Sequence, residues 1–201
     1  FMSGGIWDDG VMTHPYSDLA ATAFWRSGVA EADPAAPVDL YRPKFVLDAD
    51  AAIATAGSCF AQHVGRALRG AGMQVQDAEP RPRGCPPVVA RAYGYGVYSA
   101  RYGNIYTVRQ LVQLIGDAVA ERVDPIDIWA HEGRFYDAMR PTIEPGGFAT
   151  LDEAMALRLS HLRAVRGLFS ETACLIFTLG LTECWSDRDT AYSSGLPYRY
   201  P

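Results

Sequence analysis

The sequence predicts an α/β fold built on a parallel sheet. Two apolar runs with strand character lie far apart, at residues 52–56 and 173–181, and amphipathic helical patterns separate them. The order strand, helix, strand, helix, hairpin, helix, strand is typical of helices packed on a mostly parallel sheet. Apolar residues make up 49% and charged residues 20% of the 201 residues, a balance that supports one sizeable core.

Residues 1–44 are expected to form an irregular N-terminal arm, and residues 45–201 the α/β domain. The arm holds a proline-rich connector at 31–43 and one short amphipathic helix after an Asp18 cap. The apolar positions of that helix would be Leu19, Ala23, Phe24 and Val29.

The first strand of the domain is expected at residues 52–56, which are small and apolar on both faces, as in a strand buried on both sides. A helix follows from Cys59 and ends at two glycines, Gly70 and Gly72. Residues 73–79 are a candidate second strand. The glycine-rich, aromatic stretch 81–107 is then expected to be a long loop, and such loops are usually functional.

The second half of the domain shows clear helix and turn signals. Thr107 is expected to cap a helix, and residues 127–148 form a hairpin that turns at Glu132-Gly133. Thr150 and Glu153 form a capping box for a long helix before the last strand. The apolar stripe of the helix after Thr107 would be Val108, Leu111, Val112, Ile115 and Val119.

Bulk properties exclude several classes of function. The net charge of −5 argues against a nucleic-acid partner, and no run of 18 apolar residues predicts a membrane span. The four cysteines form no CxxC pair, and no histidine lies at zinc spacing, so we expect no metal and no cofactor. With no signal peptide visible, the cysteines indicate a reducing, cytoplasmic location. The oligomeric state is not indicated.

Two small, polar turns follow the first and last strands. One is Gly57-Ser58-Cys59 and the other is Gly180-Leu181-Thr182-Glu183. Ligands of open parallel sheets bind at the carboxyl ends of strands, so the turns would share one crevice if the strands are neighbours. A thiol at a helix start is favoured as thiolate, and free helix N–H groups there can hold an oxyanion. A buried, inert cysteine at a tight corner is the other interpretation.

Other candidate residues carry two interpretations each. Arg101 could clamp an anionic substrate or form a structural salt bridge, and Glu183 could act in the site or cap a helix. The tyrosines near Tyr102 could line a sugar or acyl site, or pack on their own sheet. His63 lies one turn below Cys59, which favours a packed or surface role. His161 is expected to be structural or solvated.

Several separated segments resemble the GSCFA family, named for the pentapeptide at residues 57–61. They are ATAGSCFAQHVG, YGVYSARYGNIYT, PGGF and IFTLGLTECW, with HPYSDL and AFWR near the start. The family is similar to SGNH-type hydrolases, which are serine esterases and acyltransferases. The resemblance implies a three-layer flavodoxin-like parallel sheet, incomplete here at its C-terminal side.

The resemblance also implies roles for individual residues. Cys59 would occupy the nucleophile position and Ser58 that of the usual aspartate, whereas a slip of one residue would make Ser58 the nucleophile. Gly103-Asn104 would supply the oxyanion-hole glycine. Thr182 would replace the usual asparagine donor, a departure that leaves its role open. Apart from the resemblance, Gly57, Gly180, Arg101 and Tyr102 are candidate substrate contacts.

The catalytic Asp-x-x-His of SGNH enzymes has no counterpart after Glu183, so the base is expected beyond Pro201. The resemblance implies an acyl hydrolase or acyltransferase acting on an acylated carbohydrate or a small ester. A non-catalytic module that binds carbohydrate or another ligand on a degenerate hydrolase fold is the alternative.

Overall fold

The computed structural model describes residues 16–33, 35, 43–181, 183–186 and 193–194. The chain divides into two compact units, Phe1–Leu47 and Asp48–Pro201. In the first unit the sequence predicts one amphipathic helix, but the structure has a 3-10 turn, η1 (Ala21–Ala23), and a π-helical turn, η2 (Arg26–Ala30). The single-helix prediction is wrong because its apolar positions find no core there, and Leu19 and Phe24 are exposed.

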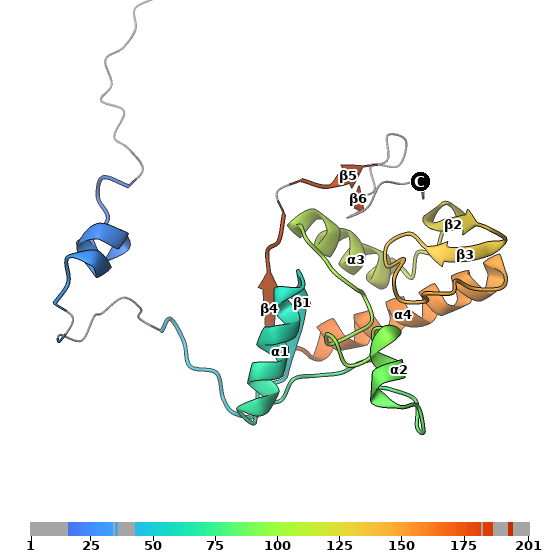
Figure 1. Ribbon diagram of the computed structural model, residues 1–201, viewed down its shortest axis with the longest axis horizontal. Helices are drawn as coiled ribbons and strands as arrows, with labels where there is room; N and C mark the ends of the chain where they lie inside the picture. Colours follow the sequence, from blue (N-terminus) through green and yellow to red (C-terminus); the bar gives the residue numbers. More distant parts are fainter. Residues whose placement is uncertain (1–15, 34, 36–42, 182, 187–192, 195–201) are drawn as a thin grey trace, which may run out of the picture. The chain divides into compact units, whose positions relative to one another are not determined.

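The second unit contains the expected parallel sheet. Strand β1 (Ile53–Gly57) pairs in parallel with β4 (Cys174–Thr178), and the register places Gly57 opposite Thr178 (Figure 1). Every residue of β1 is buried, which explains why its side chains are small. A mixed α/β fold with a parallel sheet is therefore confirmed, and in the described part of the chain this sheet has two strands.

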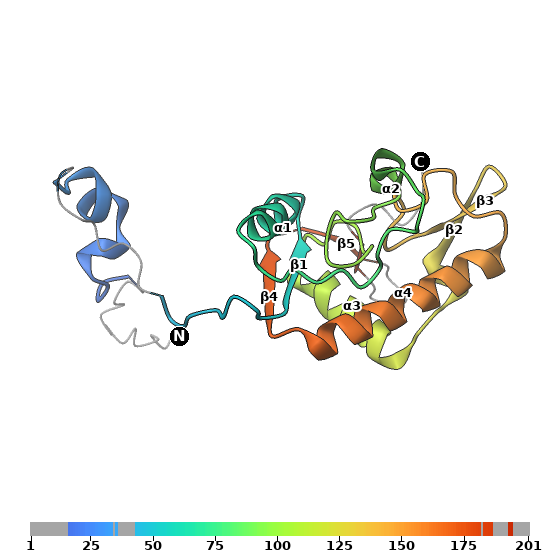
Figure 2. The same cartoon turned by 90° about the horizontal axis from the view of Figure 1, so that it is seen from below.

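Helices cover this strand pair. Helix α1 (Phe60–Gly70) follows β1 directly and packs on β1 and β4 (Figure 2). Ala54 and Ala56 of β1 belong to a core cluster with three residues of α4 (Leu151–Glu171), namely Leu162, Val165 and Leu168. The strand ends are therefore held between helices.

The candidate second strand forms only one bridge. Val75 pairs with Ile53 in parallel, and the Gln76 amide donates to the Ile53 carbonyl at 2.9 Å. The segment thus runs beside β1 as expected but leaves it after one residue pair.

Helix α3 (Val108–Ala120) begins at Thr107 with a capping box completed by Gln110, as the cap prediction requires. Its predicted apolar stripe is partly wrong, because Val108, Val112 and Val119 are exposed. The inward face carries Asp117, which is buried in an ion pair with Arg158 of α4. That pairing turns a charged position inward and leaves valines outside.

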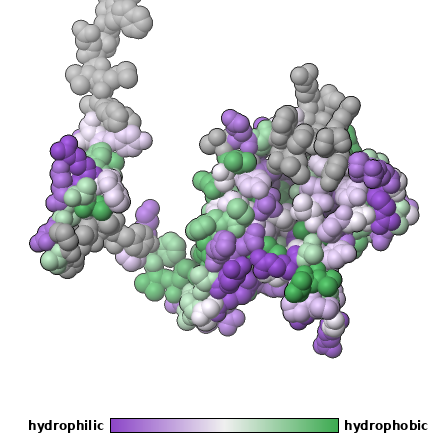
Figure 3. Space-filling model, in the orientation of Figure 1, coloured by the Kyte–Doolittle hydropathy of each residue, from purple (hydrophilic) through white to green (hydrophobic). Residues whose placement is uncertain are grey.

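The remaining elements are short. The predicted hairpin is confirmed as β2 (Ile128–His131) and β3 (Arg134–Asp137), with Glu132 and Gly133 both at positive φ. The expected loop contains a helix, α2 (Pro87–Ala92), that the sequence pattern does not predict. Figure 3 shows a hydrophobic surface around α2, where Val88 and Val89 are exposed, beside the hydrophilic outer face of α1. The others are η3 (Pro125–Asp127), β5 (Trp185–Ser186) and β6 (Ser193–Ser194).

Candidate functional site

The turns after β1 and β4 lie side by side, as the sequence predicts for neighbouring strands. The Ser58 amide donates to the Thr178 carbonyl at 3.0 Å and to the Thr178 hydroxyl at 3.1 Å. The hydroxyl oxygens of the two residues are 3.0 Å apart. Two strand ends distant in the sequence therefore form one small, hydrogen-bonded surface.

Glycine is required where these turns touch. Gly57 has φ 127°, and a Cβ there would lie 2.6 Å from the Thr178 nitrogen. At Gly180 a Cβ would lie 2.8 Å from the Ser58 Cβ and 2.7 Å from a ring carbon of Tyr106. Both predicted glycines therefore let chain segments approach closely. The Gly180 amide donates to the Tyr106 carbonyl at 3.1 Å, so that N–H is already occupied.

The structure separates Ser58 from Cys59. Ser58 is 8% exposed, and its hydroxyl is engaged with Thr178. Cys59 is exposed, has a free thiol, and occupies the N-cap position of α1. Its sulfur is thus open to a substrate at the end of a helix where several N–H groups have no partner within the helix. The expectation of a buried thiol at this corner is wrong, because Cys59 is exposed.

Asn104 reaches the same surface through Tyr98. The Ile105 amide donates to the Gly57 carbonyl at 2.8 Å, which fixes this loop against the first turn. The Tyr98 hydroxyl donates to Asn104 Oδ1 and lies 3.5 Å from the Ser58 carbonyl. Burial raises the pKa of Tyr98, and a Cys59 thiolate would raise it further, so this hydroxyl stays a donor at neutral pH.

A hollow of about 250 Å³ opens between α1 and α2. The Gln62 amide nitrogen donates to the Tyr98 hydroxyl at 3.3 Å, which connects the hollow to the turn. Both predicted oxyanion-loop residues, Gly103 and Asn104, contribute to it. The lining comprises Gln62, Arg91, Ala92, Gly94, Val97, Tyr98, Gly103, Asn104, Thr142 and Ile143.

Arg101 and Tyr102 lie beneath this surface. Arg101 is 7% exposed, pairs with Glu144 at 2.8 Å and stacks over the Tyr95 ring at 4.0 Å. Tyr102 is buried and donates its hydroxyl to the Thr55 carbonyl. Of the two interpretations of Arg101, the contacts favour the structural salt bridge.

The remaining candidates are Glu183, Thr182 and His63, and the structure assigns none of them a role in the site. Glu183 is exposed, and Thr182 lies outside the described residues. His63 is exposed on α1, with its ring centroid 6.3 Å from that of Phe60. In the described part of the chain, no hydrogen bond or ion pair joins a histidine to Cys59.

Sequence reasoning missed a buried dyad of His161 and Glu79. His161 Nδ1 lies 2.7 Å from Glu79 Oε2, and His161 is 1% exposed. Burial and the charge of Arg140 lower the pKa of His161 to about 4, so the ring is neutral at pH 7. No nearby motif signals this pair, since 82 positions separate the two residues.

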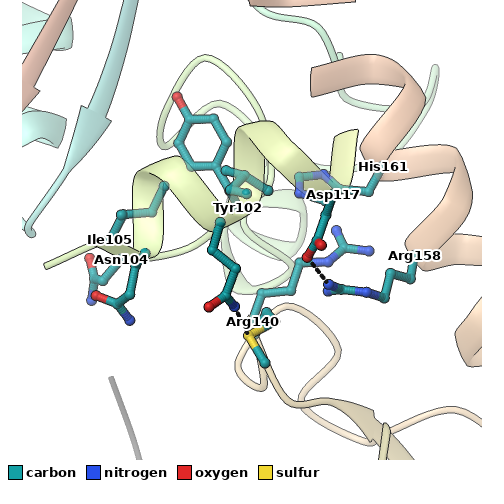
Figure 4. Close-up of a pocket in the computed structure, with 11 residues that line it drawn as sticks. Tyr102, Asn104, Ile105, Asp117, Arg140, Arg158 and His161 are labelled. Atoms are coloured by element: carbon teal, nitrogen blue, oxygen red, sulfur yellow. Dashed lines mark hydrogen bonds and ion pairs between the residues drawn. The ribbon is translucent and has the colours of Figure 1, made fainter. Parts of the chain in front are cut away.

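A second, much smaller cavity of about 30 Å³ runs from Asn104 to Arg158 and His161 (Figure 4). Arg158 donates to Asp117 at 3.1 Å and to Asp137 at 2.9 Å, and Arg140 donates to Asp137 at 2.7 Å. Burial would raise the pKa of Asp137, but Arg158 and Arg140 hold it below its usual value. This ion-pair network joins α3, α4 and the hairpin, which marks it as structural.

Together these features define a mixed α/β domain with an exposed thiol at a strand–helix turn and a polar hollow between α1 and α2. The chain belongs to the GSCFA family, whose model matches residues 52–197, as the sequence motifs predict. No curated protein and no solved structure matches the chain. Within the described ranges, none of the helices combines the length and apolar character that a bilayer span requires.

Proposed function

We propose that the chain carries the nucleophile of an acyl hydrolase or acyltransferase, and that the nucleophile is Cys59. One observation carries this assignment: Cys59 is exposed at the start of α1, while Ser58 is 8% exposed and hydrogen-bonded to Thr178. Of two adjacent candidates, only the thiol is free to reach a carbonyl carbon.

The reaction would use the Cys59 thiolate on an ester of an acylated carbohydrate or small alcohol. The sulfur attacks the carbonyl carbon, and its electron pair forms the new C–S bond as the carbonyl oxygen becomes an oxyanion. Collapse of that intermediate expels the alcohol and leaves a thioester on Cys59. Water then releases the acid, or an acceptor hydroxyl takes the acyl group.

Two kinds of described donor support a proposed oxyanion site. They are N–H groups at the start of α1, apart from that of Ala61, which donates to the Ser58 carbonyl at 2.9 Å, and the Asn104 amide. Thr182, which lies outside the described residues, stays a proposed third donor. Tyr98 acts as a positioning residue because it fixes Asn104 Oδ1, which leaves the amide nitrogen as the donating end. At present this nitrogen donates to the Tyr106 hydroxyl at 2.9 Å, an exposed contact that a substrate oxygen can replace.

The proton from Cys59 requires a base. None of the described histidines is hydrogen-bonded to the thiol, so we place this base outside the described residues. For this function we propose a three-layer fold with a flavodoxin-like sheet in which β1 and β4 are neighbours. It would bring the ends of both strands, and a base that serves Cys59, to one edge of the sheet.

A binding module without catalysis is the second candidate. It is favoured by the hollow, which offers hydrogen-bonding side chains from Gln62, Tyr98 and Asn104. Among the described residues, moreover, no base is bonded to Cys59. A saccharide hydroxyl could be held there with no covalent step.

Steady-state hydrolysis of short-chain 4-nitrophenyl esters by the full-length protein separates the two candidates. We expect Cys59→Ala to abolish turnover, Ser58→Ala to reduce it only moderately, and Cys85→Ala, which removes a thiol from the loop before α2, to leave it unchanged. Turnover that survives in Cys59→Ala would exclude this cysteine, and no turnover by the unmutated protein would favour the binding module.

A further inference from the structure

The hollow between α1 and α2 has one charged side chain. Arg91 of α2 lines it, and its other polar lining groups are the neutral side chains of Gln62, Tyr98, Asn104 and Thr142. No carboxylate contributes to the lining. The hollow is therefore locally positive on a chain whose net charge is −5.

The Arg91 guanidinium is available to a ligand. Its one hydrogen bond in the described part of the chain joins NH2 to Gln62 Oε1 at 3.3 Å, a contact to a neutral amide. Glu144 follows Ile143, a residue that lines the hollow, and its carboxylate pairs with Arg101 at 2.8 Å. Since that carboxylate is neutralised by another arginine, it does not cancel the charge of Arg91.

The hollow is also linked to Ser58, the residue before Cys59, by a short series of contacts. Arg91 bonds to Gln62, Gln62 to the Tyr98 hydroxyl at 3.3 Å, and the Tyr98 hydroxyl lies 3.5 Å from the Ser58 carbonyl, next to Cys59. Gln62 is three positions after Cys59, so both side chains lie on neighbouring positions of one helix face. A ligand held by Arg91 would therefore lie against the face of α1 that carries Gln62, three positions after Cys59.

We infer that the substrate of this site is anionic, and that Arg91 selects it by binding a carboxylate or phosphate oxygen in the hollow. The inference rests on the proposed function for the acyl-transfer step. It adds that the substrate carries a negative charge, which attack by Cys59 does not itself require. A guanidinium with free N–H groups is the side chain best suited to both oxyanions, because it can donate two parallel hydrogen bonds.

The test compares alkylation of Cys59 by iodoacetate, an anion, and by iodoacetamide, its neutral counterpart. In both, the thiolate displaces iodide and forms a thioether, and peptide mass spectrometry locates the product on Cys59. In the full-length protein we expect Arg91→Gln to lower the iodoacetate-to-iodoacetamide rate ratio roughly fivefold to tenfold. Arg91→Lys should retain part of the ratio.

Arg83→Gln is the matched control. Arg83 lies in the segment just before α2, is exposed and does not line the hollow, so the variant removes the same charge outside the site. Its ratio should equal that of the unmutated protein. The inference would be overturned if the iodoacetate-to-iodoacetamide rate ratio were the same in Arg91→Gln and Arg83→Gln. Any difference from the unmutated protein would then come from the lost positive charge and not from its place in the hollow.

Ester kinetics give a second readout. We expect Arg91→Gln to raise the KM for mono-4-nitrophenyl glutarate about tenfold relative to the KM for 4-nitrophenyl acetate. Protection of Cys59 by inorganic phosphate, lost in Arg91→Gln, would assign a phosphate ligand, whereas protection by glutarate alone would assign a carboxylate. If no ester is hydrolysed, the proposed function fails, but the alkylation ratio still decides whether Arg91 selects anions.

Discussion

Ser58 and Thr178 are 120 positions apart in sequence, yet their hydroxyl oxygens lie 3.0 Å apart and the Ser58 amide donates to the Thr178 carbonyl at 3.0 Å. This pairing joins the end of β1 to the end of β4. It holds Ser58 inward, and the next residue, Cys59, is left exposed at the start of α1. The candidate site depends on this junction.

Gly57→Ala should break the junction. A Cβ would overlap the Thr178 backbone, and φ 127° is strained for any residue except glycine. We expect a loss of at least about 3 kcal/mol in the free energy of unfolding, measured by urea denaturation.

The control for that variant is Gly70→Ala at the end of α1, where an added Cβ meets nothing within 4 Å. It should be neutral or stabilise by about 0.5 kcal/mol, because alanine restricts the unfolded chain. Equal stability of the two variants would show that contact with Thr178 does not require glycine.

Arg158→Met should be strongly destabilising. Arg158 is 1% exposed, and its loss would leave the carboxylates of Asp117 and Asp137 with fewer partners in the interior. We expect a cost of about 3–5 kcal/mol in urea unfolding. Arg163→Met on the same helix removes an exposed pair with Glu121 and should cost less than about 1 kcal/mol. A small cost at both positions would contradict the structural role of the network.

Acidification should destabilise the fold through His161. Its pKa falls from 6.5 to about 4 on folding, so between these values the unfolded chain binds a proton that the folded chain does not. Stability therefore falls as pH drops from about 6.5 to 4, by about 3 kcal/mol in total. Urea unfolding at intervals across this range measures the slope, and His161→Gln should flatten it. A slope that is the same in both proteins would assign the pH dependence to other groups.

Tyr98→Phe should weaken the site without unfolding the domain. It removes the hydroxyl that donates to Asn104 Oδ1, so the amide of Asn104 is free to rotate. We expect kcat for 4-nitrophenyl acetate to fall about tenfold, with little change in KM. Tyr93→Phe is the control, because Tyr93 is exposed and its hydroxyl has no bond within the described residues. A KM effect alone would show that Tyr98 only lines the hollow.

Local signals in the sequence predict much of this structure. The Thr107 and Thr150 caps, the Glu132-Gly133 turn and the small-residue strand β1 each depend on neighbouring residues, and all are present. The adjacency of the two turns follows from the rule that parallel strands end at one edge of a sheet.

The features that the sequence does not predict are contacts between residues far apart in the chain. Asp117 faces inward because Arg158, 41 positions away, pairs with it, and an apolar periodicity cannot register such an ion pair. The His161–Glu79 contact and the pairing of Arg101 with Glu144 have the same origin. Charged residues were therefore the least predictable part of both the fold and the site.

The most direct test of the central claim is the mass of the covalent intermediate. The full-length protein is mixed with 4-nitrophenyl acetate, quenched in acid during the first turnover and digested for peptide mass spectrometry. We predict a single acetyl group on Cys59, labile to hydroxylamine as a thioester is, and absent in Cys59→Ala. An acetyl group on Ser58, or turnover with no acetylated peptide, would contradict the account.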